Sequence, residues 1–298
     1  MNRLRADLLL LLTAAIWGLA FIAQKIGNES LPPMAFVGAR FLLSAIVILP
    51  FALGEARKAE RPLQRHDVLT ALIIGLLLFV GGALQQIAMI TASATHGGFL
   101  TALYVVIVPF AMWILTRERV RPFVLIACAI SIGGAWLLTG KGNAAQGWHT
   151  GDTLLLVSDV AWAFWISLIA VFLKSTYRPF FLALTQFVVT AILAIGASLV
   201  FESPTMTGFE TALLAILFTG IISGGLAFTL QIVAQRYTPP AEAALIVSLE
   251  SVFAAIAGAV WLSERLTPLA LTGCVLILMG VIVAETGPTL MRRFRAAR

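Results

Sequence analysis

Ten apolar stretches, each long enough to cross a lipid bilayer, constrain the fold of this sequence more than any other feature. A spanning helix needs about 20 mainly apolar residues, and the connections between the stretches leave no room for a separate soluble domain. The stretches cover residues 6–27, 31–53, 67–91, 94–115, 119–139, 150–173, 178–201, 208–236, 240–262 and 267–287. The sequence therefore predicts an all-α integral membrane protein with ten transmembrane helices.

The composition supports a membrane protein independently of the spans. Hydrophobic residues make up 60% of the chain and charged residues 11%, with a mean hydropathy of +0.99, whereas soluble domains carry about 25% charged residues. We find no alternating strands of about ten residues, as a β-barrel would require. The first stretch resembles a signal peptide because Arg3 and Arg5 precede it, but it has no clear small-residue cleavage site, so we expect a retained first helix.

The distribution of basic residues predicts the orientation. If the N-terminus is cytoplasmic, 16 of the 20 Lys and Arg residues fall in cytoplasmic segments. The opposite face then keeps at most Lys25, Lys141 and Arg265, and Arg40 lies inside the second span. The positive-inside rule thus predicts that both termini are cytoplasmic. The net charge of +6 reflects this topology, and nucleic acid is not an expected partner.

The second half of the sequence repeats the first. Residues 84–140 align without gaps with residues 230–286 after a shift of 146 positions. The polar, proline and cysteine identities in this register are Gln85 and Gln231, Glu118 and Glu264, Arg119 and Arg265, Pro122 and Pro268, and Cys128 and Cys274. We therefore expect one five-helix repeat over 1–145, and a second over 146–298 that ends in a basic cytoplasmic tail. Because five is odd, the second repeat enters the bilayer from the opposite side, which makes the repeats inverted.

A charged turn marks the same point in both repeats, as LTRERVRP at 115–122 and WLSERLTP at 261–268. The shared residues are Glu118 and Arg119 in the first turn, and Glu264 and Arg265 in the second. We interpret these pairs as structural residues that polarise a tight turn and cap the flanking helices, rather than as catalytic groups.

Inverted repeats of helices are a common way to build a transporter, because two near-equivalent halves can exchange conformations around a midplane site. WGLAFIAQK at 17–25, PPMAFVGARFLLSA at 32–45 and EAALIVSLESVFAAIAGAVWLSERLTP at 242–268 resemble the drug/metabolite transporter superfamily, and its ten-helix EamA-type members in particular. The resemblance implies a bacterial inner-membrane location, and within the superfamily it is closest to YddG-type exporters of aromatic and hydrophobic amino acids. The family often has Pro where this chain has Ser251, so the resemblance does not carry over a kink there, whereas Pro109 can bend its own span.

Polar and aromatic residues inside the spans are the candidates for a central cavity, because polar groups in a membrane are costly. The predicted substrate-binding residues are Trp17, Gln86, Tyr104, Ser158, Trp162, Trp165, Gln231, Ser248 and Glu250. Further polar or aromatic residues in matched helices are Phe21, Gln24, Gln85, Thr101, Gln235 and Ser251. A zwitterionic amino acid could bind polar groups on Gln86, Gln231 and Ser248. The aromatic residues could supply a wall and cation–π attraction.

Each of these residues also has a purely structural interpretation. Tryptophan can anchor a helix at the membrane interface, and glutamine can hold neighbouring helices together. We expect Arg40 to snorkel or to pair structurally, and no unpaired base is evident at mid-depth, which argues against phosphorylated substrates. Asp159 and Glu250 are the deepest acids. One of them could bind a proton alternately with substrate, but uncoupled, gradient-driven export is the expectation.

The leading hypothesis is therefore export of small neutral metabolites, amino acids of the aromatic, Thr or Met type above all, by alternating access. A proton-coupled multidrug exporter, a channel and an integral-membrane enzyme are the alternatives. The three histidines, His66, His96 and His149, lie near predicted loops, and neither HExxH nor G-x-S-x-G occurs, so we expect no catalytic residue, metal or cofactor. The expected partners are a small-molecule substrate and membrane lipid, and a monomer is compatible with this interpretation.

Overall fold

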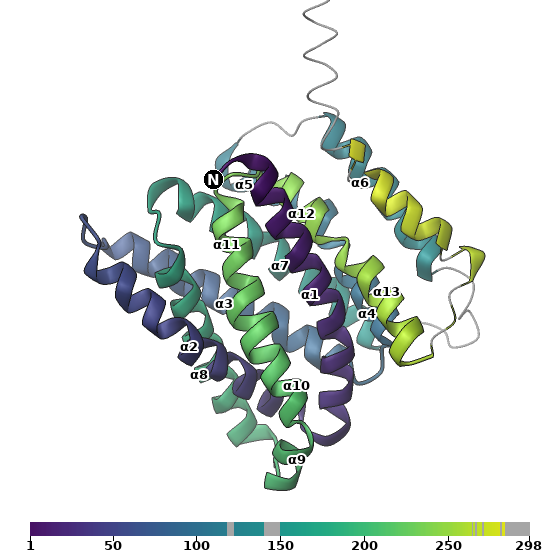
Figure 1. The fold of residues 1–298 in the computed structure, drawn as a ribbon, viewed down its shortest axis with the longest axis horizontal. Helices are drawn as coiled ribbons and strands as arrows, with labels where there is room; N and C mark the ends of the chain where they lie inside the picture. Colours follow the sequence, from purple (N-terminus) through teal and green to yellow (C-terminus); the bar gives the residue numbers. More distant parts are fainter. Residues whose placement is uncertain are drawn as a thin grey trace, which may run out of the picture.

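The chain forms a bundle of antiparallel helices (Figure 1). The computed structural model describes residues 1–117, 122–139, 150–263, 265, 267–269, 271–280 and 282–283. The first repeat contains α1 (Arg3–Ser30), α2 (Pro33–Arg57), α3 (Arg65–Ala88), α4 (Ala94–Thr101), α5 (Tyr104–Thr116) and α6 (Pro122–Thr139). The second contains α7 (Thr150–Ser175), α8 (Pro179–Phe201), α9 (Met206–Thr211), α10 (Leu213–Leu217), η1 (Phe218–Phe228), α11 (Thr229–Gln235), α12 (Pro240–Val247) and α13 (Glu250–Trp261).

The helices confirm the predicted fold class. Eight of the described helices are long and apolar enough to cross a membrane, and two shorter apolar helices, Pro122–Gly134 and Leu271–Gly280, bring the number of spans to ten. Six of the predicted spans coincide with single helices, and the described part of the tenth contains the helix Leu271–Gly280. The other three, at 94–115, 208–236 and 240–262, are each divided into shorter helical segments.

The inverted symmetry is clearest where α2 packs against α8. The carboxylate of Glu55, near the end of α2, accepts hydrogen bonds from the backbone N–H groups of Phe180 (3.2 Å) and Phe181 (2.9 Å) at the start of α8. At the other end of the pair, the carboxylate of Glu202 accepts hydrogen bonds from the N–H groups of Met34 and Ala35, both at 2.8 Å, at the start of α2. Each helix therefore supplies a carboxylate cap to the other, and the pair is clamped at both ends.

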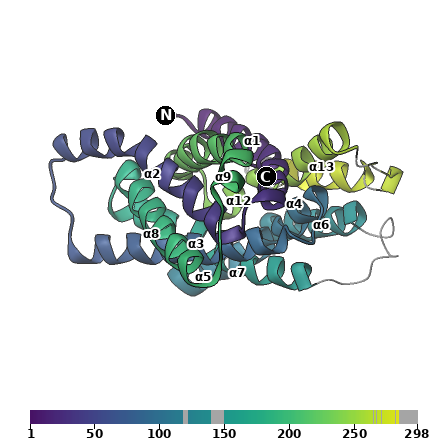
Figure 2. The same ribbon diagram turned by 90° about the horizontal axis from the view of Figure 1, so that it is seen from below.

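The packing of α6 against the helix Leu271–Gly280 follows the same symmetry, and the two lie side by side in Figures 1 and 2. A Cβ added to Gly134 would lie 2.7 Å from the carbonyl oxygen of Gly273, and one added to Gly280 would lie 2.9 Å from that of Ala127. The two contacts are related by the 146-residue shift found in the sequence. Glycine is therefore required at both positions for the helices to approach this closely.

Two of the spans break at equivalent points. The fourth span is interrupted at 102–103 and the ninth at 248–249, so Tyr104 and Glu250 become equivalent first residues of α5 and α13. Proline does not cause the second break. Ser248 donates a hydrogen bond to the carbonyl oxygen of Leu245 (2.7 Å), and Ser251 donates one to the carbonyl oxygen of Ser248 (2.8 Å). These hydroxyls satisfy carbonyl groups at the interruption, so the ninth span breaks without the proline that the family often has.

The eighth span contains the π-helix η1, which the sequence did not predict. Its glycine Gly224 lies directly against the hydroxyl of Ser44 in α2, where a Cβ would collide. The hydroxyl of Ser44 donates a hydrogen bond to the carbonyl oxygen of Gly220 (2.7 Å). Wide π-helical turns leave carbonyl groups available to other partners, and η1 uses one of them to bind α2.

The charged turn of each repeat follows a residue with left-handed backbone conformation. Arg117 ends α5 with φ 58°, and its equivalent Ser263 has φ 56°. A left-handed residue at a helix C-terminus ends the helix in a defined direction, which agrees with a structural turn in both repeats. The exposed Arg265 is described, whereas the predicted turn residues Glu118, Arg119 and Glu264 lie outside the described residues.

Candidate substrate cavity at the interface of the two repeats

A cavity of about 40 Å³ lies where α1, α2, α3, α4 and α5 meet α7, η1 and α13. Both repeats contribute to its wall. The residues that line it are Trp17, Ala20, Phe21, Gln24, Arg40, Gln85, Thr101, Tyr104, Trp162, Trp165, Ile166, Ser223, Phe228 and Glu250. Five of the nine predicted substrate-binding residues are therefore brought together: Trp17, Tyr104, Trp162, Trp165 and Glu250.

Aromatic side chains form one wall of the cavity. The ring centroids of Trp17 and Phe228 lie 4.5 Å apart. Those of Trp162 and Trp165 lie 5.4 Å apart, with the two rings edge to face. The exposed fractions of Trp17, Trp162 and Trp165 are only 8%, 8% and 0%. These three tryptophans thus lie in the interior rather than at the membrane interface, unlike the exposed Trp136.

The indole N–H groups of these tryptophans are all bound to protein. Trp17 donates to the carbonyl oxygen of Ser223 in η1 (3.3 Å), Trp165 to the side chain of Gln186 (2.8 Å), and Trp162 to the side chain of Gln85 (3.1 Å). A buried indole needs such a partner. Since every N–H is already satisfied, the rings offer the cavity their apolar and π surfaces.

Arg40 brings an unpaired positive charge to the cavity. It is 7% exposed, and its guanidinium lies over the rings of Phe41 (4.9 Å) and Phe36 (5.8 Å). Within the described part of the chain it has no ion pair, and its Nε has no hydrogen-bond partner. A buried guanidinium of this kind is ready to bind an anionic group. The expectation that no unpaired base lies at mid-depth is therefore wrong, and the structural partners of Arg40 are aromatic rings rather than an acid.

Glu250 brings a buried carboxyl group to the same cavity. Its side chain is 3% exposed and lines the cavity together with its symmetry equivalent, Tyr104, whose hydroxyl has no hydrogen-bond partner among the described residues. Arg40 and Glu250 form no ion pair with each other. The cavity consequently presents a buried guanidinium and a buried carboxyl group, without an ion pair between them, beside an aromatic wall.

The other four predicted residues, Gln86, Ser158, Gln231 and Ser248, do not line the cavity. Gln86 donates hydrogen bonds to the carbonyl oxygen of Gln24 (3.3 Å) and to the side chain of Asn28 (2.8 Å), and so holds α3 to α1. Gln231 donates to Gln235 (2.8 Å) on its own helix.

The hydroxyls of Ser158 and Ser248 donate to carbonyl oxygens three residues earlier. Two glutamines and two serines thus have structural partners in this conformation.

Sequence reasoning overlooked Arg40, Ser223 and Phe228 as cavity residues. A charge inside a span is by itself a signal of function, and Arg40 has no acid three or four residues away on its own helix with which to pair. That signal could have identified it. Ser223 and Phe228 had no such signal, because they reach the cavity through the unpredicted π-helix.

The cavity is closed in this structure. Its volume of about 40 Å³ has room for only a few water molecules, and the residues that line it are buried. Helix α1 is held at both ends. At its start, Asp7 accepts a hydrogen bond from the hydroxyl of Thr238, and Arg3 forms an ion pair with Glu242.

At the other end the Lys25 ammonium donates to the carbonyl oxygens of Met89 (3.1 Å), Ile90 (3.2 Å) and Ala92 (2.9 Å). A substrate can enter only if the surrounding helices move apart.

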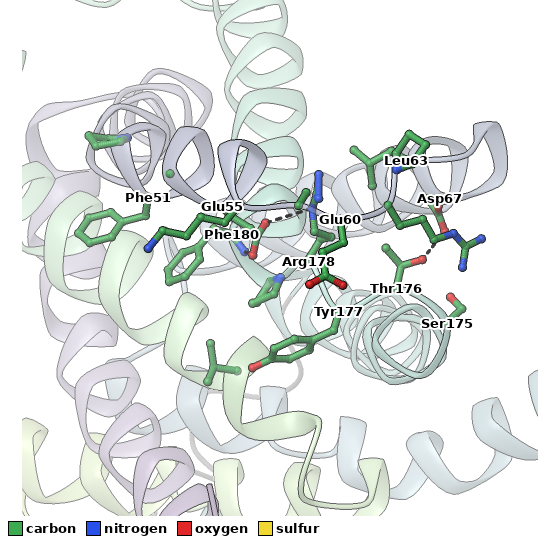
Figure 3. A pocket seen from close by; sticks show the side chains of 18 residues that line it. Phe51, Glu55, Glu60, Leu63, Asp67, Ser175, Thr176, Tyr177, Arg178 and Phe180 are labelled. Carbon is green, nitrogen blue, oxygen red and sulfur yellow. Dashed lines mark hydrogen bonds and ion pairs between the residues drawn. The ribbon is translucent and has the colours of Figure 1, made fainter.

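A larger hollow of about 850 Å³ lies at the end of the bundle where α1 begins (Figure 3). It is surrounded by the α2–α3 and α7–α8 connections, and the carboxylates of Glu55 and Asp67 in its wall are already engaged. Glu55 caps α8 and lies 3.9 Å from Arg178, while Asp67 accepts hydrogen bonds from Thr176 (2.5 Å) and from the backbone of Gln64 (2.9 Å). This hollow is therefore built in part from helix caps, and the guanidinium and carboxyl group without an ion pair lie in the interior cavity.

No metal site is visible in the described ranges of the chain, where no three His, Cys, Asp or Glu side chains cluster closely enough to hold an ion.

Comparison with known proteins agrees with this architecture. The model of the EamA-like transporter family matches the chain twice, over residues 4–140 and 149–286. An uncharacterized transporter of Archaeoglobus fulgidus is 31% identical and aligns over 95% of this chain and 87% of its own. The uncharacterized inner membrane transporter YedA of Escherichia coli is 33% identical over 50% of this chain and 48% of its own.

A WAT1-related protein of Arabidopsis thaliana is 24% identical over 89% of this chain and 79% of its own. One crystal structure superposes with a TM-score of 0.77, covering 98% of this chain and 99% of the other at 19% identity, and so shares the fold. With its two matched halves and its membrane-spanning helices, the chain belongs to the EamA-like transporter family.

Proposed function

We propose that this transporter exports amino acids with apolar or aromatic side chains across a bacterial inner membrane, by alternating access to the interior cavity. The proposed orientation places both termini in the cytoplasm, as the positive-inside rule predicts. The end of the bundle that carries Arg3, Lys58, Arg61 and Arg178 then faces the cytoplasm.

The separation of Arg40 from Glu250 in one cavity is the observation that carries this proposal. An α-amino acid at neutral pH has one carboxylate and one ammonium group, and it can neutralise both side chains at once. Arginine binds carboxylates through two parallel hydrogen bonds. A carboxylate beside tryptophan and tyrosine rings suits an ammonium group.

The aromatic wall indicates the kind of side chain. Trp17, Trp162, Trp165 and Phe228 present ring surface rather than hydrogen-bond donors. Apolar or aromatic side chains gain from contact with such a surface. Phenylalanine is therefore the substrate with which we would begin.

The closed cavity requires a conformational change, and the broken fourth and ninth spans are suited to it. Tyr104 and Glu250 each begin a helix directly after a break. A small change at the breaks at 102–103 and 248–249 would move both side chains relative to Arg40 on the continuous helix α2. Short interruptions of this kind absorb backbone rotation in moving helices.

Competition in proteoliposomes tests the proposal. Counterflow of labelled phenylalanine would be measured against unlabelled phenylalanine, phenethylamine (which lacks the carboxylate) and 3-phenylpropionate (which lacks the ammonium). Leaving Arg40 or Glu250 unpaired costs about 3 kcal/mol, so each truncated compound should compete about 100-fold more weakly. Equal competition by phenethylamine and phenylalanine would overturn the role of Arg40 and with it the proposed substrate.

Export of lipophilic cations is a second candidate, because Glu250 lies beside three tryptophans. The unpaired charge of Arg40 in the same cavity opposes a purely cationic substrate. Movement of a labelled lipophilic cation, together with no phenylalanine counterflow, would favour this second function.

A further inference from the structure

The hollow at the end of the bundle where α1 begins breaks the symmetry of the two repeats. Through the 146-residue shift, the connection between α2 and α3 corresponds to the segment that contains α9, at the opposite end of the bundle (Figure 1). In that segment α9 packs closely against the α1–α2 connection, since a Cβ added to Gly208 would lie 2.5 Å from the carbonyl oxygen of Ser30. The equivalent residues 60–64 form no helix. One end of the bundle is therefore filled where the other is hollow.

The burial of two equivalent residues shows the same difference. Leu31, in the α1–α2 connection, is 2% exposed and packs with Ala212, Ala215 and Ile216, which follow α9. Its equivalent Tyr177, in the α7–α8 connection, is 40% exposed and lines the hollow. The volume of about 850 Å³ lies within the range of roughly 300–1,000 Å³ that small-molecule sites occupy.

Basic residues outnumber acidic ones around the hollow. Residues 55–67 and 174–178, which form its two connections, contain six Lys and Arg residues and three Asp and Glu residues. Two of the three carboxylates already accept hydrogen bonds: Glu55 from backbone N–H groups at the start of α8, and Asp67 from Gln64 and Thr176. Glu60 is then the one acid in the described wall without such a bond. The hollow is therefore suited to an anion.

Three bases of the wall are available to bind that anion. Lys58 and Arg61 are exposed and make no ion pair with any described residue. Arg178 lies 3.9 Å from Glu55, but its Nε has no hydrogen-bond partner within the described ranges. Arginine and lysine donors of this kind bind phosphate oxygens.

The remaining wall of the hollow is apolar and borders the membrane. The rings of Phe51 on α2 and Phe180 on α8 stack with their centroids 5.7 Å apart, and both residues line the hollow (Figure 3). Phe51 is 56% exposed, as is expected of a side chain that faces lipid on a spanning helix. A ligand in this hollow would consequently meet bases on one side and a lipid-facing aromatic pair on the other.

We propose that this hollow binds one anionic phospholipid. Its phosphate group would lie among Lys58, Arg61 and Arg178, and its acyl chains would run along Phe51 and Phe180. A zwitterionic phospholipid fits less well, because its ammonium group would meet the surplus of bases. The bound lipid would join the α2–α3 and α7–α8 connections, as α9 joins their equivalents at the other end.

The orientation proposed above agrees with this ligand. It places the hollow at the cytoplasmic leaflet, where anionic lipids attract basic segments and basic pockets between spans bind lipid headgroups. The lipid site requires neither amino-acid binding nor transport. Failure of the proposed substrate would therefore leave it intact.

Lipid binding to the purified full-length protein in detergent tests the inference. The protein would be titrated with phosphatidylglycerol and the bound lipid counted by native mass spectrometry, with phosphatidylethanolamine and glycerol 3-phosphate as the comparison ligands. We expect one phosphatidylglycerol at saturation, and affinities about tenfold lower or less for the other two. Equal binding of phosphatidylethanolamine would indicate ordinary annular lipid, and equal binding of glycerol 3-phosphate a site for soluble phosphates. Either result would overturn the lipid site.

A pair of charge variants locates the binding site. Each base near a lipid headgroup contributes about fivefold in affinity, so Lys58→Gln combined with Arg61→Gln should weaken phosphatidylglycerol binding about 25-fold. The matched control combines Arg57→Gln with Arg65→Gln, which removes two exposed bases of the same connection that do not line the hollow. The control should bind phosphatidylglycerol as the wild type does. An equal loss in both proteins would show general attraction to a basic surface and would overturn the site.

A steric variant tests the same site without changing charge. Gly54 lines the hollow, and a Cβ there would meet no atom within 4 Å. Gly54→Leu should therefore fold normally, fill part of the hollow and reduce phosphatidylglycerol binding about tenfold. Gly196→Leu, at an equally open position on α8 outside the hollow, should bind as the wild type does. Wild-type affinity in Gly54→Leu would place the lipid elsewhere and overturn the inference.

Discussion

Removing one of the two carboxylate clamps between α2 and α8 should destabilise the protein measurably. In Glu202→Gln the side chain keeps one oxygen acceptor, so one of the two 2.8 Å hydrogen bonds to Met34 and Ala35 is lost, together with the negative charge at the start of α2. Helix α2 has no side-chain cap of its own, since its N-cap residue is Pro32. The loss of a cap costs about 0.5–2 kcal/mol, and the loss of the charge at the helix N-terminus costs about 0.3–1 kcal/mol.

The two contributions together predict a loss of about 1–3 kcal/mol, which corresponds to a fall in melting temperature of about 3–8 °C. The assay is thermal unfolding of the purified protein in detergent, with Glu210→Gln as the matched control, because Glu210 is exposed. Glu55→Gln should have a similar effect at the other end of the pair. The two clamps are separated by the 23 residues of α8, or about 35 Å, so their effects should add in the double variant. A Glu202→Gln protein as stable as the wild type would refute the clamp.

Three further substitutions test separate parts of the structure. Trp162→Ala removes part of the cavity wall and the hydrogen bond to Gln85. It should reduce phenylalanine counterflow about tenfold or more, while the protein is still expressed normally. Unchanged transport kinetics would make this tryptophan a packing residue. Gly134→Val should destabilise the protein by about 1–3 kcal/mol, measured by thermal unfolding. Gly133→Val is the control and should leave the stability unchanged, because no atom lies within 4 Å of the Cβ position of Gly133. Lys25→Met removes the donor to three carbonyl groups and should speed hydrogen exchange in residues 85–92; unaltered exchange would contradict its role in closing that end of α1.

The sequence was sufficient to predict the fold class because membrane spans and inverted repeats leave direct traces in it. A run of about 20 apolar residues identifies a membrane span, whatever helices pack against it. The breaks in the fourth and ninth spans and the π-helix in the eighth depend instead on tertiary contacts. Ser251 and Ser248 satisfy carbonyl groups at one break, and Ser44 approaches Gly224 of η1 from another helix.

The candidate cavity could be predicted in part for the same reason. Trp17 and Trp162 are large aromatic residues in mid-span, and such residues are recognisable in one helix at a time. Gln86 and Gln231 are equally polar, but the structure gives them partners within or between helices. Which polar residue reaches a cavity depends on helix rotation, and hydropathy does not specify that rotation.

Arg40 is the residue for which the sequence-based prediction and the structure differ most. From sequence alone it resembled the arginine found in the second helix of the family, and we expected it to snorkel or to pair structurally. Only the assembled bundle reveals that the guanidinium lies over Phe41 and Phe36, with no carboxylate beside it in the described part of the chain. The proposal of a zwitterionic substrate depends on that absence of a partner.

Phenylalanine counterflow by the Arg40→Gln protein in proteoliposomes is the most direct test of the central claim, that a zwitterion binds between Arg40 and Glu250. The matched control is Arg57→Gln, which removes an exposed arginine from the same helix. We predict that Arg40→Gln raises the half-saturating phenylalanine concentration about 100-fold and leaves competition by phenethylamine unchanged, while Arg57→Gln transports as the wild type does. An Arg40→Gln protein that transports phenylalanine with wild-type affinity would contradict the account.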